Sequence, residues 1–156
     1  VPYCLQGGTA LSEGIGEILT ELPSAPRCSV IIAKPPIHVS TRFVYENLRL
    51  DSLEKHPDID GILDSIREGN ILGVAERLEN VLETVTQKEY PVIGQIKQFL
   101  VHRGALGALM SGSGPTVFAL YDRKDLAARA CEDLRRAGLA KQVYLTSFSD
   151  KTCIRK

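Results

Sequence analysis

The sequence has little aromatic character and no excess of charge. Its 156 residues include no tryptophan, five tyrosines and four phenylalanines, and 19 Lys and Arg residues balance 19 Asp and Glu residues. Nucleic-acid binding needs basic surfaces that contact several phosphates, and single-strand binding adds clustered aromatic platforms. Because both features are scarce, we expect no nucleic acid among the partners of this chain.

Cysteine pairs and long apolar runs are also absent. The four cysteines, Cys4, Cys28, Cys131 and Cys153, are widely spaced, with no Cys-x-x-Cys pair and no nearby histidine. The spacing therefore predicts no zinc site, and we expect no metal site in this chain. Cys28 and Cys131 fall in apolar patterns and are predicted to be small buried side chains in a reducing compartment. No apolar stretch approaches the roughly 18 residues of a membrane span, so no membrane partner is expected.

What the sequence does contain is enough apolar material for one core. Hydrophobic residues make up 44% of the chain, and a domain of this length buries about two-thirds of its unfolded surface. The first residue is Val1, without an initiator Met or the basic segment of a signal peptide. We therefore expect the chain to be a piece of a longer protein.

The amino-terminal third predicts strands followed by a helix. Two short strands with a glycine-containing turn between them are expected within residues 8–22. A continuous β-branched run at 28–33 predicts a buried central strand. A helix is then expected to begin near Ser40 or Thr41, where a hydroxyl is available as N-cap.

The middle third has the apolar spacing of amphipathic helices. Three helices are predicted, one between Ile59 and Ile66, one carrying the stripe from Val74 to Val85, and one from Pro91 to Leu100. Gly69 and Gly104 stand where the first and third should end.

The last third alternates strands and a helix. Strands are predicted at 105–111, 116–121 and 141–148, and a helix at 123–137 with Asp122 as N-cap in a capping box. Strands separated by helices favour an α+β fold with an antiparallel sheet and helices packed on one face. The sharpest version of that prediction is a ferredoxin-like plait with extra helices.

One loop stands out as a candidate site. In Gly112-Ser113-Gly114-Pro115, two glycines flank a serine, so the backbone can adopt positive φ and approach a ligand closely. Successive N–H groups in such a loop can form an anion-binding nest. The alternative is a tight hairpin turn in which the glycines serve only geometry. Val117 replaces the third glycine of a dinucleotide fingerprint, and the chain has no P-loop sequence.

A second candidate follows the central strand. A Pro-Pro corner precedes a hydroxyl-capped helix start, which favours anions, and Tyr45 offers a ring face to a base. Plain capping and a core-facing tyrosine are the alternatives, and His38 is interpreted as a surface histidine. Glu79 and Glu83, four residues apart, are expected on one solvated helix face.

Four segments, taken in order, resemble the GHMP small-molecule kinases: residues 1–17, 33–45, 78–83 and 110–121. They are most similar to the members that act on a cytidine-diphosphate-linked methylerythritol. The resemblance implies that ATP, assisted by Mg²⁺, phosphorylates the 2-hydroxyl of this small molecule in non-mevalonate isoprenoid biosynthesis. It also implies the fold of a GHMP kinase carboxy-terminal domain.

The resemblance also assigns roles to residues. Residues 112–114 match the family's third motif, which borders the active site and supports the phosphate-binding loop. Tyr45 matches an aromatic residue that stacks on cytosine, and Thr41 belongs to the stretch leading to it. The family's catalytic Asp would precede Val1, and its ATP loop and amino-terminal Lys lie further upstream. No catalytic residue is therefore expected in this chain.

The same resemblance divides the chain and sets its context. Residues 1–22 would continue strands of an amino-terminal domain, 23–150 would form the carboxy-terminal domain, and 151–156 a basic tail. The amino-terminal part of the same enzyme is the expected partner, the chain alone is expected to be inactive, and the location is expected to be cytoplasmic, or the plastid stroma in a plant. A GHMP kinase of the homoserine or mevalonate type, or a non-catalytic ferredoxin-like ligand-binding module, remains as an alternative.

Overall fold

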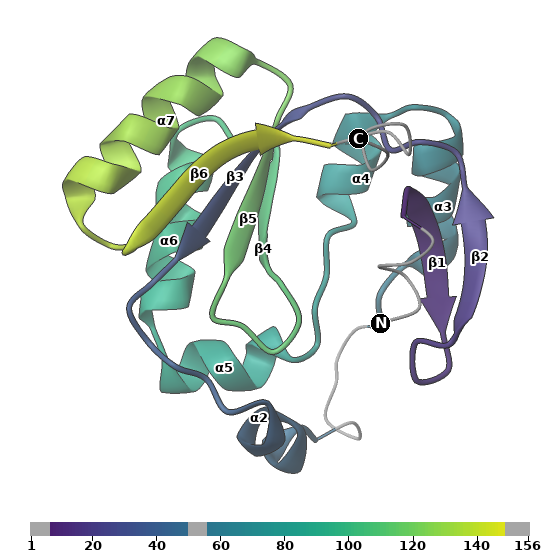
Figure 1. Ribbon diagram of the computed structural model, residues 1–156, viewed down its shortest axis with the longest axis horizontal. Helices are drawn as coiled ribbons and strands as arrows, with labels where there is room; N and C mark the ends of the chain where they lie inside the picture. Colours follow the sequence, from purple (N-terminus) through teal and green to yellow (C-terminus); the bar gives the residue numbers. More distant parts are fainter. Residues whose placement is uncertain (1–6, 50–55, 149–156) are drawn as a thin grey trace.

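The computed structural model describes residues 7–49 and 56–148, which form two separate sheets. The smaller sheet is an antiparallel hairpin of β1 (Thr9–Glu13) and β2 (Ile18–Leu22), as the pattern within 8–22 predicted. It stands apart from the larger sheet (Figure 1).

The larger sheet has four antiparallel strands in the order β4-β5-β3-β6. They are β3 (Ser29–Lys34), β4 (Gly107–Met110), β5 (Val117–Tyr121) and β6 (Gln142–Ser147). Along the chain, helices follow β3 and β5, so the unit is β-α-β-β-α-β. β3 and β5 are the two central strands of the sheet. This is the arrangement of a ferredoxin-like plait, and the predicted fold class is confirmed.

Six helices are described between and beside these strands. They are α2 (Thr41–Asn47), α3 (Ile59–Arg67), α4 (Ile71–Glu76), α5 (Glu83–Glu89), α6 (Val92–His102) and α7 (Lys124–Ala137). Gly138 ends α7 in the left-handed conformation, and Gly104 follows α6 with positive φ. Gly104 thus stands at the helix end that the sequence assigned to it, and Gly138 ends α7 in the same way.

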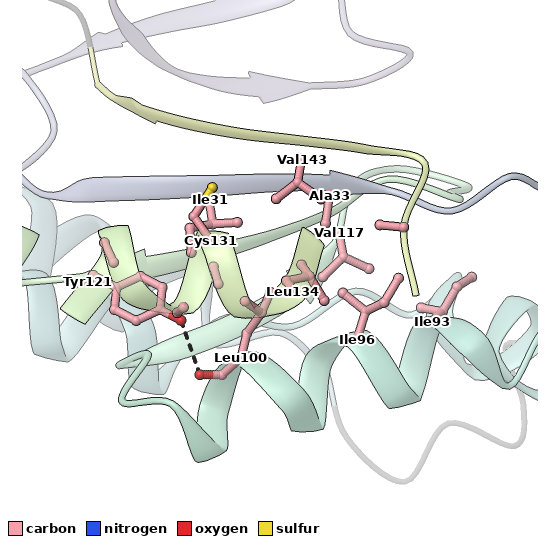
Figure 2. Close-up of a cluster of buried hydrophobic side chains, with 14 of the residues drawn as sticks. Ile31, Ala33, Ile93, Ile96, Leu100, Val117, Tyr121, Cys131, Leu134 and Val143 are labelled. Carbon is pink, nitrogen blue, oxygen red and sulfur yellow. Dashed lines mark hydrogen bonds between the residues drawn. The ribbon is translucent and has the colours of Figure 1, made fainter. Parts of the chain in front are cut away.

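The main core lies between the sheet and the helices α6 and α7 (Figure 2). From α6, Ile93, Ile96 and Leu100 are fully buried, at the i, i+3 and i+7 positions that the sequence marked. The Tyr121 hydroxyl is also buried and donates a hydrogen bond to the Leu100 carbonyl at 3.1 Å. Burial raises the pKa of Tyr121 well above its usual range, so it stays a neutral donor.

The opposite face of the sheet is covered as well, by α3 and α4. Side chains alternate along β3, so Val30 faces this second cluster while Ile31 faces the main core. Val30 and Leu120, paired across the strands, lie in one cluster with Val74 of α4. The helices therefore cover both faces of the sheet, whereas the predicted plait had them on one face.

The predicted helix carrying the stripe from Val74 to Val85 is wrong as one element. The structure has two short helices, α4 and α5, with residues 77–82 between them outside any helix. Asn80 lies in that interval, and its side-chain amide donates to the Met110 carbonyl at the end of β4 and to the Gly112 carbonyl in the β4–β5 loop. The apolar spacing predicted helix correctly in α4 and α5, but the chain is not helical between them, where Asn80 contacts the loop.

The predicted capping box at the start of α7 is also wrong. Arg123 is the N-cap residue, in an extended conformation, and no side chain caps the helix. Asp122 is therefore one residue too early to reach the first helical N–H groups. Asp125 pairs instead with Arg123 at 2.7 Å, and the hydrogen bond from that guanidinium lowers the pKa of the Asp125 carboxyl.

Cys28 and Cys131 are buried, as predicted. Cys4, Cys153 and the tail 151–156 lie outside the described residues. Within 7–49 and 56–148, no helix is long and apolar enough to cross a membrane.

Candidate functional site

The loop between β4 and β5 is shaped by its two glycines. Gly112 has φ of 57° and Gly114 has φ of 87°, a region that other residues enter only with strain. A Cβ added at Gly114 would also lie 2.6 Å from the sulfur of Met110. The loop closes because the Ser111 N–H donates to the Thr116 carbonyl at 2.8 Å and the Gly114 N–H donates to the Ser111 carbonyl at 3.0 Å.

These internal bonds leave two successive N–H groups of the loop unused. In the part of the chain that the structure describes, no group accepts a hydrogen bond from the N–H of Gly112 or of Ser113. Gly112 is exposed and Ser113 is half-buried. Neighbouring backbone N–H groups next to a positive-φ glycine can bind an anion such as a phosphate oxygen. The hairpin-turn geometry and the anion nest are therefore compatible in this loop.

Asn80 binds the other side of the loop. Its amide Nδ2 donates to the carbonyls of Met110 and Gly112, both at 2.8 Å, and its Oδ1 accepts from the Leu82 N–H at 3.1 Å. The orientation of the amide is fixed by these neighbours, because two carbonyl oxygens can be approached only by N–H groups.

Thr86 supports the same loop from α5. Its side chain is fully buried, and its hydroxyl lies 3.1 Å from the Leu82 carbonyl and 3.3 Å from the Ser113 carbonyl. One hydroxyl proton serves both acceptors, so the bond to the loop is the weaker of the two.

Helix α2 approaches the loop from a distant part of the sequence. Ser40 caps this helix, as predicted, by accepting the Phe43 N–H at 3.3 Å. The Thr41 hydroxyl then meets the Ser113 hydroxyl at 2.9 Å, across a separation of 72 residues. Two of the predicted site residues are thus in direct contact.

Tyr45 lies on the same side of α2 as Thr41, one helical turn further on. Its side chain is 60% exposed, whereas the neighbouring Val44 is fully buried. The core-facing alternative for Tyr45 is therefore excluded, and its ring is accessible for stacking. His38 is exposed, as interpreted from the sequence.

A cleft of about 910 Å³ opens on the other face of α2. Phe43 and Asn47 line one wall, residues 78–81 and 83–85 line another, and Lys97 of α6 contributes from a third element. The predicted stacking residue is not part of this wall. The cleft is therefore a separate concavity from the surface that carries Thr41 and Tyr45.

Glu83 in this cleft is buried, which corrects its assignment to a solvated helix face. It is 8% exposed, and the Lys97 ammonium lies 2.7 Å from its Oε1 and donates to its Oε2 at 2.8 Å. The prediction failed because the helix on which Glu79 and Glu83 would share a face is interrupted. Among the described residues, no three His, Cys, Asp or Glu side chains group as metal ligands do.

Comparison with known proteins places the chain in a family. Residues 44–140 match the model of the GHMP kinases C-terminal family. The chain belongs to this family. The matched span contains α5, the whole β4–β5 loop, and the Asn80 and Thr86 side chains that bind it.

Curated relatives agree with that assignment. The chain is 55% identical over 148 residues to the 4-diphosphocytidyl-2-C-methyl-D-erythritol kinase of Lachnoclostridium phytofermentans, which covers 95% of this chain and 51% of the relative. The protein of that name from Lachnospira eligens is 51% identical, with 94% and 51% covered. The chain thus spans about half the length of the curated relatives it matches.

Solved structures share the fold. A crystal structure of 4-(cytidine 5'-diphospho)-2C-methyl-D-erythritol kinase superposes with a TM-score of 0.78 at 28% identity, covering 95% of this chain and 52% of that one. Homoserine kinase from Cytophaga hutchinsonii, with a TM-score of 0.72 at 20% identity and coverage of 95% and 50%, shows that the fold is common to kinases with other names.

Proposed function

We propose that this chain is the carboxy-terminal part of a kinase that phosphorylates the 2-hydroxyl of 4-diphosphocytidyl-2-C-methyl-D-erythritol with ATP. The name of the relatives at 51–55% identity supports the substrate. The geometry that carries the proposal is the cluster of Thr41, Ser113 and the two unused N–H groups of the β4–β5 loop.

The loop is suited to a phosphate group. Phosphoryl transfer depends on positioning and on stabilising charge at the phosphate oxygens, and preorganised N–H donors provide both. In the proposed site, the Gly112 and Ser113 N–H groups border the phosphoryl group, while the Thr41 hydroxyl orients the Ser113 side chain. Residues 112–114 thereby support phosphate binding and do not supply the base.

Tyr45 is suited to the cytosine end of the substrate. A largely exposed aromatic ring on a capped helix can stack on a flat base. Because Tyr45 and Thr41 lie on one side of α2, a ligand extending from ring to loop would carry its base and its phosphates along that side. Stacking binds substrate and transition state alike, so this residue is assigned to affinity.

The proposal assigns no proton transfer and no metal binding to these residues. The catalytic Asp, the main ATP loop and the amino-terminal Lys would come from the amino-terminal part of the same enzyme. Mg²⁺ would neutralise phosphate charge in the reaction, and the described residues offer no carboxylate cluster to hold it. We place the reaction in non-mevalonate isoprenoid precursor biosynthesis, in the cytoplasm.

The test is a phosphorylation assay on the complete kinase, meaning a polypeptide of the relatives' length that carries this chain. ADP release is measured with 4-diphosphocytidyl-2-C-methyl-D-erythritol, homoserine and mevalonate as separate acceptors. The expected result is turnover of the cytidyl substrate only, with no turnover by the 156-residue chain alone. Turnover of homoserine or mevalonate in its place, or activity of the chain alone, would contradict the proposal.

A further inference from the structure

We propose that Asn80 is a positioning residue of the kinase: it orients the backbone of the β4–β5 loop so that the Ser113 N–H faces the phosphoryl group. This inference rests on the proposed function. It concerns a residue that lies between two helices and that the resemblance assigned no role.

The peptide bond between Gly112 and Ser113 links the Asn80 contact to the orientation of the Ser113 N–H. The Gly112 carbonyl and the Ser113 N–H belong to the same peptide bond, which is trans, so they point in opposite directions. The Asn80 amide binds that carbonyl at 2.8 Å. The Ser113 N–H must then point away from Asn80, and it is one of the two unused donors of the loop.

The Asn80 amide also links the loop to the main core. Asn80 also binds the Met110 carbonyl at 2.8 Å, and Met110 is 1% exposed in the main core. One amide therefore connects the exposed Gly112 to a residue that the core immobilises. Without this connection, the Gly114 N–H bond to the Ser111 carbonyl and the weaker Thr86 bond to the Ser113 carbonyl would alone restrain the peptide between Gly112 and Ser113, since a positive-φ glycine has few steric limits of its own.

Both the NH₂ group and the carbonyl oxygen of the Asn80 side chain form hydrogen bonds. Nδ2 donates twice to the loop and Oδ1 accepts from the Leu82 N–H. An aspartate of the same shape would keep the acceptor for Leu82 but would have no donor for the loop. Asn80→Asp thus separates orientation of the loop from the local structure of residues 77–82.

The experiment measures steady-state kinetics of the complete kinase with ATP and the cytidyl substrate. A misoriented donor at the reacting group costs rate more than binding, so Asn80→Asp should lower kcat about 10- to 100-fold. The KM for the cytidyl substrate should change little. Tyr45→Ala should give the converse result, a raised KM with nearly unchanged kcat.

Two controls separate positioning from folding. Asn70→Asp makes the same chemical change at an exposed N-cap that accepts from Gly73 and does not contact the loop, and it should leave kcat unchanged. Asn80→Gln keeps the amide donors and should recover part of the kcat lost in Asn80→Asp. All variants are assayed well below their melting temperatures, which are measured in parallel.

The outcomes distinguish this inference from the proposed function. A folded Asn80→Asp variant with wild-type kcat, or equal loss of kcat in Asn80→Asp and Asn80→Gln, would overturn the positioning role. A complete wild-type kinase that does not turn over the cytidyl substrate would instead overturn the proposed function.

Discussion

The core between the sheet and helices α6 and α7 and the loop that joins the ends of β4 and β5 are stabilised in different ways. Between the sheet and helices α6 and α7, many apolar side chains are fully buried and share the packing among them. The β4–β5 loop has its shape from a few individual hydrogen bonds: two between its own backbone groups, those donated by Asn80 and Thr86, and the one between the Thr41 and Ser113 hydroxyls. Changes in the first region should alter stability, whereas changes in the second should alter the site while the fold persists.

The largest effect is expected in the core, from Leu100→Ala. Leu100 is fully buried, and removing such a side chain costs about 3 kcal/mol through lost transfer energy and the cavity left behind. Urea unfolding measures the free energy. Val101→Ala on the exposed side of the same helix should cost far less. Equal losses in the two variants would contradict the placement of the core.

The next effect is expected at the buried ion pair, from Glu83→Ala. The change leaves the Lys97 ammonium, 24% exposed, without its partner 2.7 Å away. Removing one member of a buried pair costs about 3–5 kcal/mol, and the partial exposure of Lys97 places the expected loss near 2 kcal/mol. Thermal unfolding measures it, with Glu89→Ala, an exposed residue of the same helix, as control. A loss no larger than the control's would show that the pair contributes nothing.

A smaller loss of stability, joined to a loss of activity, is expected from Gly114→Ala. Positive φ costs a non-glycine residue about 1–2 kcal/mol, and the added Cβ would lie 2.6 Å from the Met110 sulfur. Gly69→Ala is the matched control, because Gly69 has φ of 70° with no atom within 4 Å of its Cβ. Gly114→Ala should destabilise more than Gly69→Ala and should alone lower kcat of the complete kinase. Equal destabilisation by the two variants would show that the close approach to the Met110 sulfur adds no cost.

The smallest effect is a pH dependence in the core. Burial raises the pKa of the Cys28 thiol to about 11 from an ordinary value of 9.0. The unfolded chain therefore loses this proton at lower pH than the folded protein, so the stability is complete below about pH 9 and falls as pH rises toward 11. Urea unfolding at pH 8, 9 and 10 should show a steeper decline for the wild type than for Cys28→Ala. Parallel declines would assign the pH dependence to other groups.

The elements that sequence alone predicted are those with local signals. The strand pair around residues 112–115, helix α7 and the final strand carry a clear change of period; glycines mark the turn of the strand pair, and Gly138 ends α7. The helix start at Ser40 followed from a hydroxyl that caps it. These features depend on neighbours within a few residues, so the sequence specifies them directly.

The features that the sequence did not predict depend on distant contacts. The bond between Thr41 and Ser113 joins residues 72 apart, and no periodicity brings them together. Asn80 follows the polar residues Arg77 and Glu79, so nothing in the pattern distinguishes it or predicts its contact with the loop, although segment 78–83 was among those that resembled the family. The burial of Glu83 likewise depends on Lys97 from another helix.

The proposed function requires that, with both substrates bound, the unused N–H groups of Gly112 and Ser113 contact a phosphate oxygen while the Tyr45 ring contacts the cytosine. The most direct measurement is a crystal structure of the complete kinase with a non-hydrolysable ATP analogue and 4-diphosphocytidyl-2-C-methyl-D-erythritol. A phosphate oxygen is expected within hydrogen-bond distance of those N–H groups, at about 2.7–3.2 Å, and the cytosine ring is expected against Tyr45. Phosphates bound elsewhere, with the loop N–H groups facing only water, would contradict the proposed function.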